Sequence, residues 1–318
     1  MNLRYTNFVP PPSPGFGAAL EQAGTWNSVN TPQPFGPGVS TPLVDLDGAS
    51  TLAVAVLQGC DAYTCDVTGY GSDVASLFAA GPNGDCYADP SFTMLQGLAP
   101  GKYVMTAYTG SCYTQWSGLT VTLNDQSYQS TQQLGGEYLG NFDSMDLGSY
   151  AFDLADGVKV KVNGWSLLYV TALQLTRIEP PQVFCTAKVN SQGCAAEIAA
   201  IGNAASLSGA APFHLVASDV VNDVPGILFY GFDEDIKPFM GGLHCVQPPT
   251  PRTTYQFSGG GGVPCGGTFD LDFNAWLATQ PQPKVHAGMR LYAQYWYRDP
   301  ADPFASATSD AVSFHIVP

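Results

Sequence analysis

The stretch Met289-Arg290-Leu291-Tyr292-Ala293-Gln294-Tyr295-Trp296-Tyr297 decides the fold class. Its apolar residues recur at every second position, so that Leu291, Ala293 and Tyr295 share one side of an extended chain. A helix buried on one side would instead need an apolar repeat near 3.6 residues. The stretch is therefore predicted to be a strand that buries one of its two faces.

The same two-residue period is found along the whole chain. Scattered among these segments are 35 Gly and 25 Pro, which favour tight turns. The expected strands are Asn2–Phe8, Ser50–Leu57, Phe92–Leu95, Lys102–Thr109, Leu119–Leu123, Tyr150–Leu154, Val158–Val162, Leu167–Ile178, Glu197–Ile201, Phe213–Ala217, Gly226–Tyr230, Thr268–Phe273, Met289–Tyr297 and Ala311–Val317. We expect Tyr150–Leu154 and Val158–Val162 to form a hairpin. The pattern predicts an all-β protein of short strands.

A stiff break divides the chain at Glu179-Pro180-Pro181. A strong strand precedes it, and a second group of cysteines follows. With 318 residues the chain has room for two domains. We therefore place one domain at 1–179 and another at 180–318, as two β-sandwiches in series.

The charge pattern excludes two classes of partner. Charged residues are 12% of the chain, and the formal net charge is −15. Such a field repels nucleic acid and anionic membranes, so we expect neither as a partner. No stretch approaches the 18 or so apolar residues that a membrane-spanning helix needs, and membrane insertion is not expected either.

The eight cysteines fall into two groups of four. An even number in a chain of strands and turns indicates disulfides and an oxidising, extracellular location. Four cysteines allow three connectivities in each domain, and zinc would need tighter knuckles than Cys60 and Cys65 provide. Proximity along the chain favours the pairs Cys60–Cys65, Cys86–Cys112, Cys185–Cys194 and Cys245–Cys265.

Residues 1–179 resemble the galactose-binding-like jelly roll shared by many carbohydrate-binding modules. The resemblance is carried by the order of several pieces: Gly24–Asn27, Leu43–Gly48, Leu98–Val104, Asp156–Val160 and Tyr169–Leu175. It implies a jelly-roll sandwich and, within that family, frequent sugar binding.

Residues 180–318 resemble an immunoglobulin-like module found near the C-termini of large secreted bacterial proteins. The matching pieces are Cys185–Cys194, Pro225–Gly231 and Gln294–Pro300. This resemblance implies an immunoglobulin-like sandwich and an extracellular, cell-surface address, with no chemistry attached.

Candidate ligand-binding residues lie in two aromatic loops of the first domain. Sugar-binding sandwiches stack pyranose rings on Trp or Tyr and hold hydroxyls with amides and carboxylates. One loop contains Tyr113, Gln115 and Trp116, and the other contains Tyr63, Asp66 and Tyr70. The alternative is that these rings fill the core of the sandwich.

Two acidic loops suggest a structural calcium ion, the one cofactor that we consider. Asp45 and Asp47 begin a pattern that resembles a calcium loop, and Asp85 with Asp89 forms a similar loop. A short Asp-rich turn is the alternative in both places, because the remaining ligands of the full motif are missing.

Catalysis is the least supported interpretation. The four histidines all lie in the second domain, and we expect His286 and His315 to be strand residues. The chain has no nucleophile elbow, zinc-protease motif or phosphate-binding loop. A converging pair of carboxylates would be the one hidden route to a hydrolase.

These observations favour an extracellular, non-catalytic binding or adhesion protein, with a carbohydrate-binding first domain and a second domain for spacing or attachment. The alternative is a structural subunit that packs against copies of itself in a bacterial surface layer, filament or envelope, pairing through edge strands such as Asn2–Phe8 or Ser313–Val317. A second alternative is an accessory part of a secreted glycan-active enzyme. The expected partner is a glycan, another cell-surface polymer, or a copy of the chain.

Overall fold

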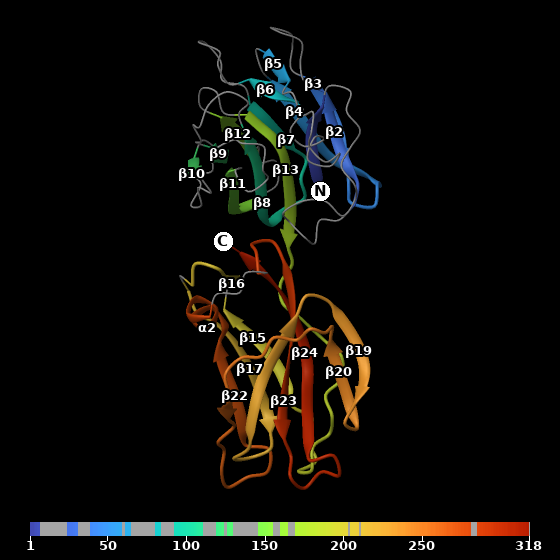
Figure 1. The fold of residues 1–318 in the computed structure, drawn as a ribbon, viewed down its shortest axis with the longest axis vertical. Coiled ribbons are helices and arrows are strands. Elements are labelled where there is room, and N and C mark those ends of the chain that lie inside the picture. Colours follow the sequence, from blue (N-terminus) through green and yellow to red (C-terminus); the bar gives the residue numbers. More distant parts are fainter. Residues whose placement is uncertain are drawn as a thin grey trace. The chain divides into compact units, whose positions relative to one another are not determined.

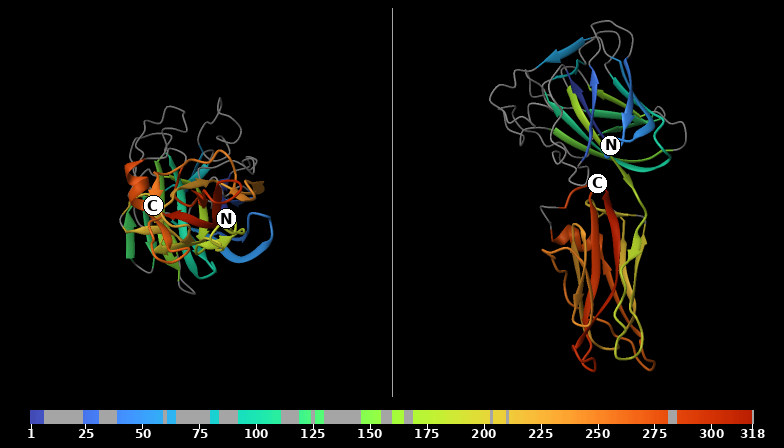
Figure 2. Two further views of the ribbon diagram at one scale, coloured as in Figure 1. Left: turned by 90° about the horizontal axis from the view of Figure 1, so that it is seen from below. Right: turned by 90° about the vertical axis from the view of Figure 1, so that its right-hand side faces the viewer.

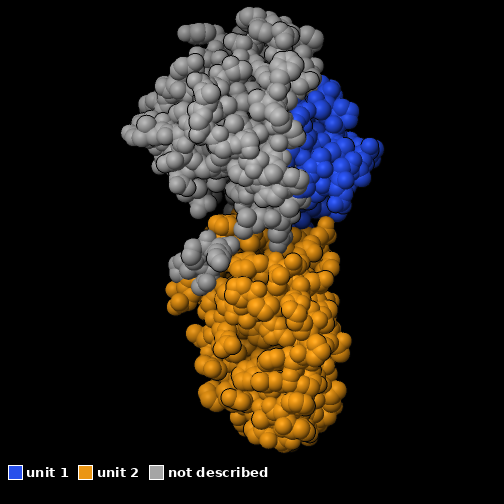
Figure 3. Space-filling model, turned by 45° about the vertical axis from the view of Figure 1, so that its right-hand side comes forward, with its two compact units in different colours: residues 1–178 blue, residues 179–318 orange. Residues whose placement is uncertain are grey.

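The computed structural model consists of two compact units, Met1–Ile178 and Glu179–Pro318 (Figure 3). It describes residues 1–6, 24–30, 39–58, 61–64, 80–83, 92–110, 119–123, 126–129, 146–154, 160–164, 169–202, 204–209, 211–280 and 285–317. The described residues are mostly strands, and the predicted all-β class is confirmed. No helix among them is long and apolar enough to cross a membrane.

Unit 1 contains two large sheets (Figure 1). Its strands are β1 (Asn2–Thr6), β2 (Trp26–Asn30), β3 (Val39–Val44), β4 (Ser50–Gln58), β5 (Asp61–Thr64), β6 (Ala80–Asn83), β7 (Phe92–Gln96), β8 (Gly101–Gly110), β9 (Leu119–Leu123), β10 (Gln126–Gln129), β11 (Asp146–Leu154), β12 (Val160–Gly164) and β13 (Tyr169–Ile178). One sheet has the order β11-β8-β13-β1-β2 and the other β10-β9-β12-β7-β4-β3, while β5 pairs with β6.

A buried amide links the two sheets of unit 1. The Asn27 side chain on β2 donates to the Val44 carbonyl on β3 at 2.9 Å and accepts from the Val44 amide at 2.7 Å. Trp26, beside it, is buried together with Val29 and Leu43. Both hydrogen-bonding groups of one backbone residue are thus satisfied where the strands of the two sheets meet.

Two expectations for unit 1 are wrong. The segments Tyr150–Leu154 and Val158–Val162 do not form a hairpin, because β11 pairs with β8 whereas β12 pairs with β7 and β9 in the other sheet. The segment at Asn2 is not an edge strand either. It lies inside its sheet, between β13 and β2.

Unit 2 is a sandwich of a larger and a smaller sheet. Its elements are β14 (Gln182–Phe184), β15 (Glu197–Gly202), β16 (Ala205–Ser206), β17 (Phe213–Val220), β18 (Pro225–Gly231), β19 (Glu234–Phe239), β20 (Gly242–Val246), β21 (Gln256–Phe257), β22 (Gly267–Asp272), α2 (Phe273–Thr279), β23 (Arg290–Arg298) and β24 (Ser306–Val317). The larger sheet has the order β14-β24-β23-β18-β21, with β16 also on β24; the smaller one is β15-β17-β22, and β19 pairs with β20. The strand at Ser313–Val317 is therefore not an edge strand, since β24 has neighbours on both sides.

Aromatic rings fill the space between the two sheets of unit 2. The Phe269 ring on β22 stacks on Tyr295 of β23 with their centroids 5.3 Å apart, and Tyr297 lies 6.0 Å from it. The Tyr295 hydroxyl donates to the Leu215 carbonyl of β17 at 2.8 Å, so the polar end of this buried ring is also satisfied. The alternation seen in the sequence at 289–297 thus reports a real buried face.

The helix α2 was not foreseen from the sequence. The Asp272 side chain caps its first turn by accepting from the Ala275 amide at 3.1 Å. Phe273 and Trp276 then contact the Tyr230 ring, with centroids 5.7 and 5.6 Å away. The helix therefore covers one end of the aromatic core.

Asp310 joins the two sheets from within β24. The pairing of β23 with β24 shifts register between Gln294 and Trp296, and Ser309 and Asp310 form the resulting bulge in β24. The Asp310 side chain leaves this bulge and accepts from the Ile198 amide on β15 at 2.6 Å. Burial, with the nearby Glu197 charge, raises the pKa of Asp310 to about 6.

His315, further along β24, titrates in the opposite sense. Burial and the nearby Arg290 charge lower the pKa of His315 to about 4, while the Glu179 carbonyl and charge act weakly against this.

The stability from Asp310 is full below its unfolded pKa near 3.8 and is lost as pH rises through 6. The stability from His315 is present above 6.5 and is lost as pH falls through 4.

Replacing Asp310 by Asn should therefore make unit 2 sensitive to acid. Asn keeps an oxygen for the Ile198 amide but cannot ionise, so the His315 contribution is no longer opposed. We expect the free energy of unfolding of Asp310→Asn, measured relative to that of the wild type, to rise by about 1–2 kcal/mol as the pH is raised from 4 to 7, after allowance for solvent screening. Urea unfolding at several pH values measures this. Parallel curves for the two proteins would contradict the assignment.

Candidate functional site

The loops at one end of unit 2 form a tightly connected surface, which we call the loop end. It comprises residues 188–195, 219–224, 240–241, 258–266 and 299–305. The right-hand view of Figure 2 shows the strands of unit 2 running lengthwise between loops, and the loop end is the end at which β17 turns into β18. The segment 188–194 contacts each of the other four loops.

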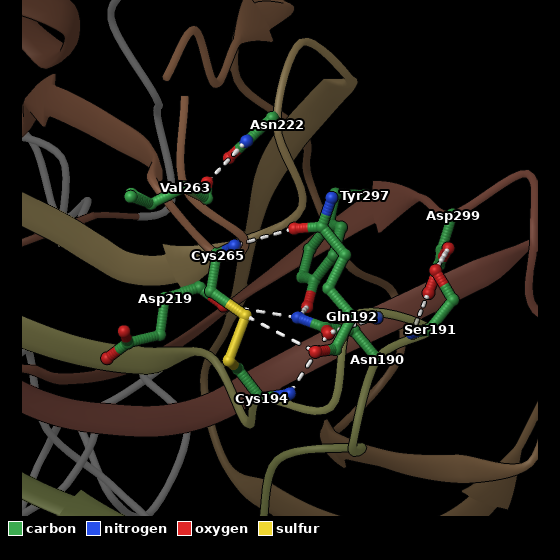
Figure 4. Close-up of a disulfide and its surroundings, with 10 residues drawn as sticks. All are labelled: Asn190, Ser191, Gln192, Cys194, Asp219, Asn222, Val263, Cys265, Tyr297 and Asp299. Carbon is green, nitrogen blue, oxygen red and sulfur yellow. Dashed lines mark hydrogen bonds between the residues drawn. A yellow bond between two sulfur atoms is a disulfide. The ribbon is translucent and has the colours of Figure 1, made fainter. Parts of the chain in front are cut away.

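Asn190 organises the centre of the loop end (Figure 4). Its side-chain oxygen accepts from the amides of Gln192 at 3.0 Å and Cys194 at 3.1 Å. Its amide nitrogen donates to the Asp219 carbonyl at 3.1 Å and to the Tyr297 hydroxyl at 3.5 Å. The side chain is buried, so one residue fixes its own turn and holds it against two neighbouring segments.

A disulfide fastens the glycine-rich loop 258–266 to the same segment. Cys194 is bonded to Cys265, and the Gln192 side chain accepts from the Cys265 amide at 2.6 Å. Figure 4 also shows the Asn222 side chain donating to the Val263 carbonyl, at 2.7 Å. The loop that carries Gly259–Gly262 is thus held by three interactions, two at Cys265 and one at Val263.

The predicted cysteine pairs of the second domain are wrong. The bonds are Cys185–Cys245 and Cys194–Cys265, not Cys185–Cys194 and Cys245–Cys265. The reason is spatial: Cys185 follows β14 and meets β20, whereas Cys194 belongs to a loop that meets the loop after β21. The presence of disulfides is confirmed. Cys60, Cys65, Cys86 and Cys112 lie outside the described residues.

An occluded ion pair anchors the other side of the loop end. The Lys188 ammonium donates to Asp302 at 2.6 Å and to the carbonyls of Met240 and Ser306, both at 2.8 Å. The side chains of Lys188 and Asp302 are only 9% and 10% exposed. The hydrogen bond from Lys188 lowers the pKa of Asp302, and the Lys188 ammonium also lies 4.9 Å from the centre of the Phe304 ring.

Asp299 supplies the remaining link. Its carboxylate is fully buried and accepts from the Ser191 amide at 2.7 Å and from the Ser191 hydroxyl. These two hydrogen bonds offset much of the free-energy cost of burying the carboxylate, which an unpaired carboxylate would bear in full. Loop 299–305 is therefore joined to segment 188–194 at Asp299 as well as at Asp302.

Left-handed backbone geometry is concentrated at the loop end. Five described residues other than Gly have positive φ there: Asp219 at 57°, Asp223 at 52°, Met240 at 46°, Cys265 at 61° and Ala305 at 52°. Such conformations are unfavourable for residues with a side chain, and they persist where surrounding contacts impose them. Clusters of this kind are typical of functional loops.

Large apolar side chains project from these rigid loops into solvent. Val189, Met240, Val263 and Phe304 are between 46% and 62% exposed. They belong to four different loops of the loop end. Four exposed apolar side chains at one end of the unit, on backbone held by a disulfide and hydrogen bonds, make the loop end a candidate contact surface.

The candidate ligand-binding residues of the first domain are not described in side-chain detail. Tyr113, Gln115, Trp116, Asp66 and Tyr70 lie outside the described residues. Tyr63 belongs to β5, whose backbone pairs with β6, and its side chain lies outside the description as well. The glycan site therefore stays a prediction.

The acidic loop at Asp45 is a hydrogen-bonded turn. The Asp45 carboxylate accepts from the amides of Asp47 at 3.0 Å and Ala49 at 2.8 Å. Asp85 and Asp89 lie outside the described residues. Among the residues that the structure does describe, no three His, Cys, Asp or Glu side chains are grouped so that they could hold a metal ion.

The histidines of unit 2 occupy four separate environments. His214 on β17 contacts the Asp270 carboxylate at 2.6 Å, which raises the pKa of this exposed imidazole, and His244 on β20 stacks on Phe229. His315 lies on β24 as expected. The prediction that His286 lies on a strand is wrong. This residue lies in the turn before β23, where its carbonyl accepts from the Met289 amide.

Comparisons with known proteins leave the family open. No family model and no curated protein matches the chain. A β-glucuronidase structure from Bacteroides uniformis aligns with 81% of this chain and 32% of its own length, at 9% identity and a TM-score of 0.22. A calcium-binding mutant of β-glucuronidase 2 from the same organism aligns with 87% of this chain and 32% of its own, at 10% identity and a TM-score of 0.21. The chain thus spans about a third of these enzymes, at scores too low to establish a shared fold.

Proposed function

We propose that this protein is a secreted, non-catalytic binding or adhesion protein and that the loop end is one of its contact surfaces. The observation that carries the proposal is the combination of exposed Val263 and Phe304 with loops fixed by Cys194–Cys265 and Lys188–Asp302. Loops that are already ordered lose little conformational entropy when they bind, and this favours affinity. Disulfides support the extracellular location, since they persist in oxidising compartments.

The first unit is proposed to be a galactose-binding-like jelly roll, and the second an immunoglobulin-like sandwich. Support comes from the strand-rich units and from the order of the sequence pieces that resemble these families. The glycan ligand is proposed for unit 1, at Tyr113, Gln115 and Trp116, whereas the loop end would contact the surface to which the protein adheres.

Binding of the labelled protein to a glycan array and to intact cells of its source organism tests this function. Val263→Ser with Phe304→Ser should weaken cell binding at least tenfold, because burying each side chain contributes about 1.5–3 kcal/mol. The matched control is Ile236→Ser on β19, which is similarly exposed outside the loop end. Trp116→Ala should abolish glycan binding by unit 1 and leave the loop end intact. Absence of binding to any glycan and to cells would overturn the proposal.

A second candidate function is a self-assembling structural subunit of a cell surface. It is favoured by one observation, the edge strand β15, whose outer side has no strand partner among the described residues.

A further inference from the structure

Strand β21 and the residue before it carry the two most exposed aromatic side chains among the described residues of unit 2. Tyr255 is 70% exposed and Phe257 is 75% exposed. Leaving rings of this size in water forgoes the free energy that their burial would release. A patch of such side chains on a surface therefore marks a candidate binding site.

The register of the larger sheet determines the face on which the two rings lie. Gly226 lies opposite Gln256 of β21, and a Cβ atom on Gly226 would meet the Phe269 ring of the smaller sheet. The row that contains these two residues thus faces the core. Successive side chains of a strand point to opposite faces, so Tyr255 and Phe257, on either side of Gln256, point outward.

The backbone that carries the rings is fixed at both ends. Thr253 donates to the Leu228 carbonyl, from its amide at 2.9 Å and from its hydroxyl at 3.1 Å. The Ser258 amide donates to the Val224 carbonyl at 3.0 Å. These two residues flank the segment 254–257. A ligand that covers the rings would order little additional backbone, which favours binding.

Two arginines lie on the same outer face. Arg298 follows Tyr297, whose ring is part of the core, and its guanidinium lies 5.0 Å from the centre of the Trp296 ring. Arg252 forms a backbone bridge with Phe229, which lies between two core residues of β18. Neither guanidinium has an ion pair or a hydrogen bond within the part of the chain that the structure describes. Their N–H donors are thus available to a ligand.

These side chains form one surface, which we call the aromatic strip: Arg252, Tyr255, Phe257, Trp296 and Arg298. Arg298 lies in the row of Pro225, and Arg252 lies in the row of Phe229, four residues further along β18. The two arginines also lie two strands apart, so about 17 Å separates their backbones. The two bare rings follow Arg252 along the edge of the sheet, toward the row of Arg298. A ligand that touches the whole strip is therefore extended.

The charges of the chain decide which class of extended ligand fits. With a net charge of −15, the chain repels polyanions, acidic proteins and other copies of itself. A basic partner would be attracted to the acidic surface elsewhere and repelled by Arg252 and Arg298. A neutral polysaccharide meets neither obstacle, because its C–H faces stack on aromatic rings and its hydroxyl oxygens accept from guanidinium groups.

We propose that the aromatic strip of unit 2 binds a neutral polysaccharide as an extended chain of several sugars. Sugar rings stack on Tyr255 and Phe257, and hydroxyls of the flanking sugars accept hydrogen bonds from Arg252 and Arg298. The strip shares no residue with the glycan site proposed for unit 1 or with the loop end. Its binding does not depend on either of them.

Affinity electrophoresis of the full chain in gels that contain dextran, mannan, arabinoxylan, galactan or mixed-linkage β-glucan tests this site. We expect at least one of these neutral probes to retard the wild type. Tyr255→Ala with Phe257→Ala should weaken that binding about tenfold or more, because both stacking rings are lost. Tyr255→Phe with Phe257→Tyr keeps both rings and should bind like the wild type. The matched control Ile236→Ala, at a site 53% exposed on β19, should also bind like the wild type.

Salt and the unit 1 site separate the proposal from its alternatives. Raising the salt concentration tenfold should change the affinity by less than about twofold, because the ligand carries no charge to be screened. Binding should persist in Trp116→Ala, which removes the unit 1 site. Circular dichroism confirms that each variant is folded.

Three results would overturn the proposal. The first is that no probe retards the wild type. The second is binding that Trp116→Ala abolishes and the paired alanine variant leaves unchanged, which would assign it to unit 1. The third is equally strong binding to polyglutamate that salt suppresses, which would show that the two arginines select an acidic peptide.

Discussion

Replacing both Cys194 and Cys265 by Ser is expected to lower the free energy of unfolding of unit 2 by about 4 kcal/mol. The bond joins residues 71 positions apart, and it restricts the unfolded chain in proportion to the logarithm of that separation. Urea unfolding followed by tryptophan fluorescence measures the change. Removing both cysteines together leaves no single thiol that could exchange with the other disulfides.

The second disulfide provides the control for this experiment. Cys185 and Cys245 lie 60 positions apart, so replacing both should cost a similar amount of stability. This bond lies outside the loop end, however, and binding through the loop end should then be retained. Equal loss of binding in the two double variants would show that stability, and not the fixing of loop 258–266, controls the contact surface.

Truncating the Phe269 ring should lower the free energy of unfolding of unit 2 by a similar amount. Phe269→Ala removes a fully buried ring that stacks on Tyr295 and contacts Tyr297, and such changes cost about 3–5 kcal/mol. Urea unfolding measures the loss. A cost below about 1 kcal/mol would mean that the sheets close over the gap, which the rigid aromatic core does not favour.

The close approach of Gly226 to the Phe269 ring allows a second test of this packing. A Cβ atom at Gly226 would collide with the end of the Phe269 ring, so Gly226→Ala alone should cost about 1–3 kcal/mol. Phe269→Leu shortens the side chain and relieves the collision. The double variant should therefore be more stable than the sum of the two single changes predicts. Simple additivity would contradict direct contact between the two positions.

Strands were predictable from the sequence, whereas their partners were not. The alternation over 289–297 corresponds to β23, and Leu119–Leu123 agrees with β9 at both ends. A two-residue period shows that a segment is extended and half-buried, but it carries no information about its neighbour in the sheet. For that reason the sequence predicts one hairpin from Tyr150–Leu154 and Val158–Val162, whereas the two segments belong to different sheets.

The loop end was not predictable for a related reason. Its residues come from five segments that only the folded sandwich brings together. Asn190 had the composition of a turn, and nothing in the sequence indicated its contacts with Asp219 and Tyr297. Met240 and Ala305 adopt left-handed backbone geometry although neither residue type favours it. No local feature of the sequence therefore indicates this geometry.

The cysteine pairing failed because distance along the chain is a poor guide to distance in a sandwich. Cys185 and Cys194 are close in sequence, yet one lies beside β20 and the other in the loop end. The even number of cysteines indicated bonding, and the connectivity required the fold.

The two bonds of unit 2 also interleave, since Cys194 lies between Cys185 and Cys245, and Cys245 lies between Cys194 and Cys265. Consequently, a protease that cuts one peptide bond anywhere from residue 185 to residue 265 leaves the two fragments covalently joined. This span includes four of the five exposed loops at the loop end. Wherever reductants are too scarce to break the two disulfides, a nicked molecule would stay in one piece.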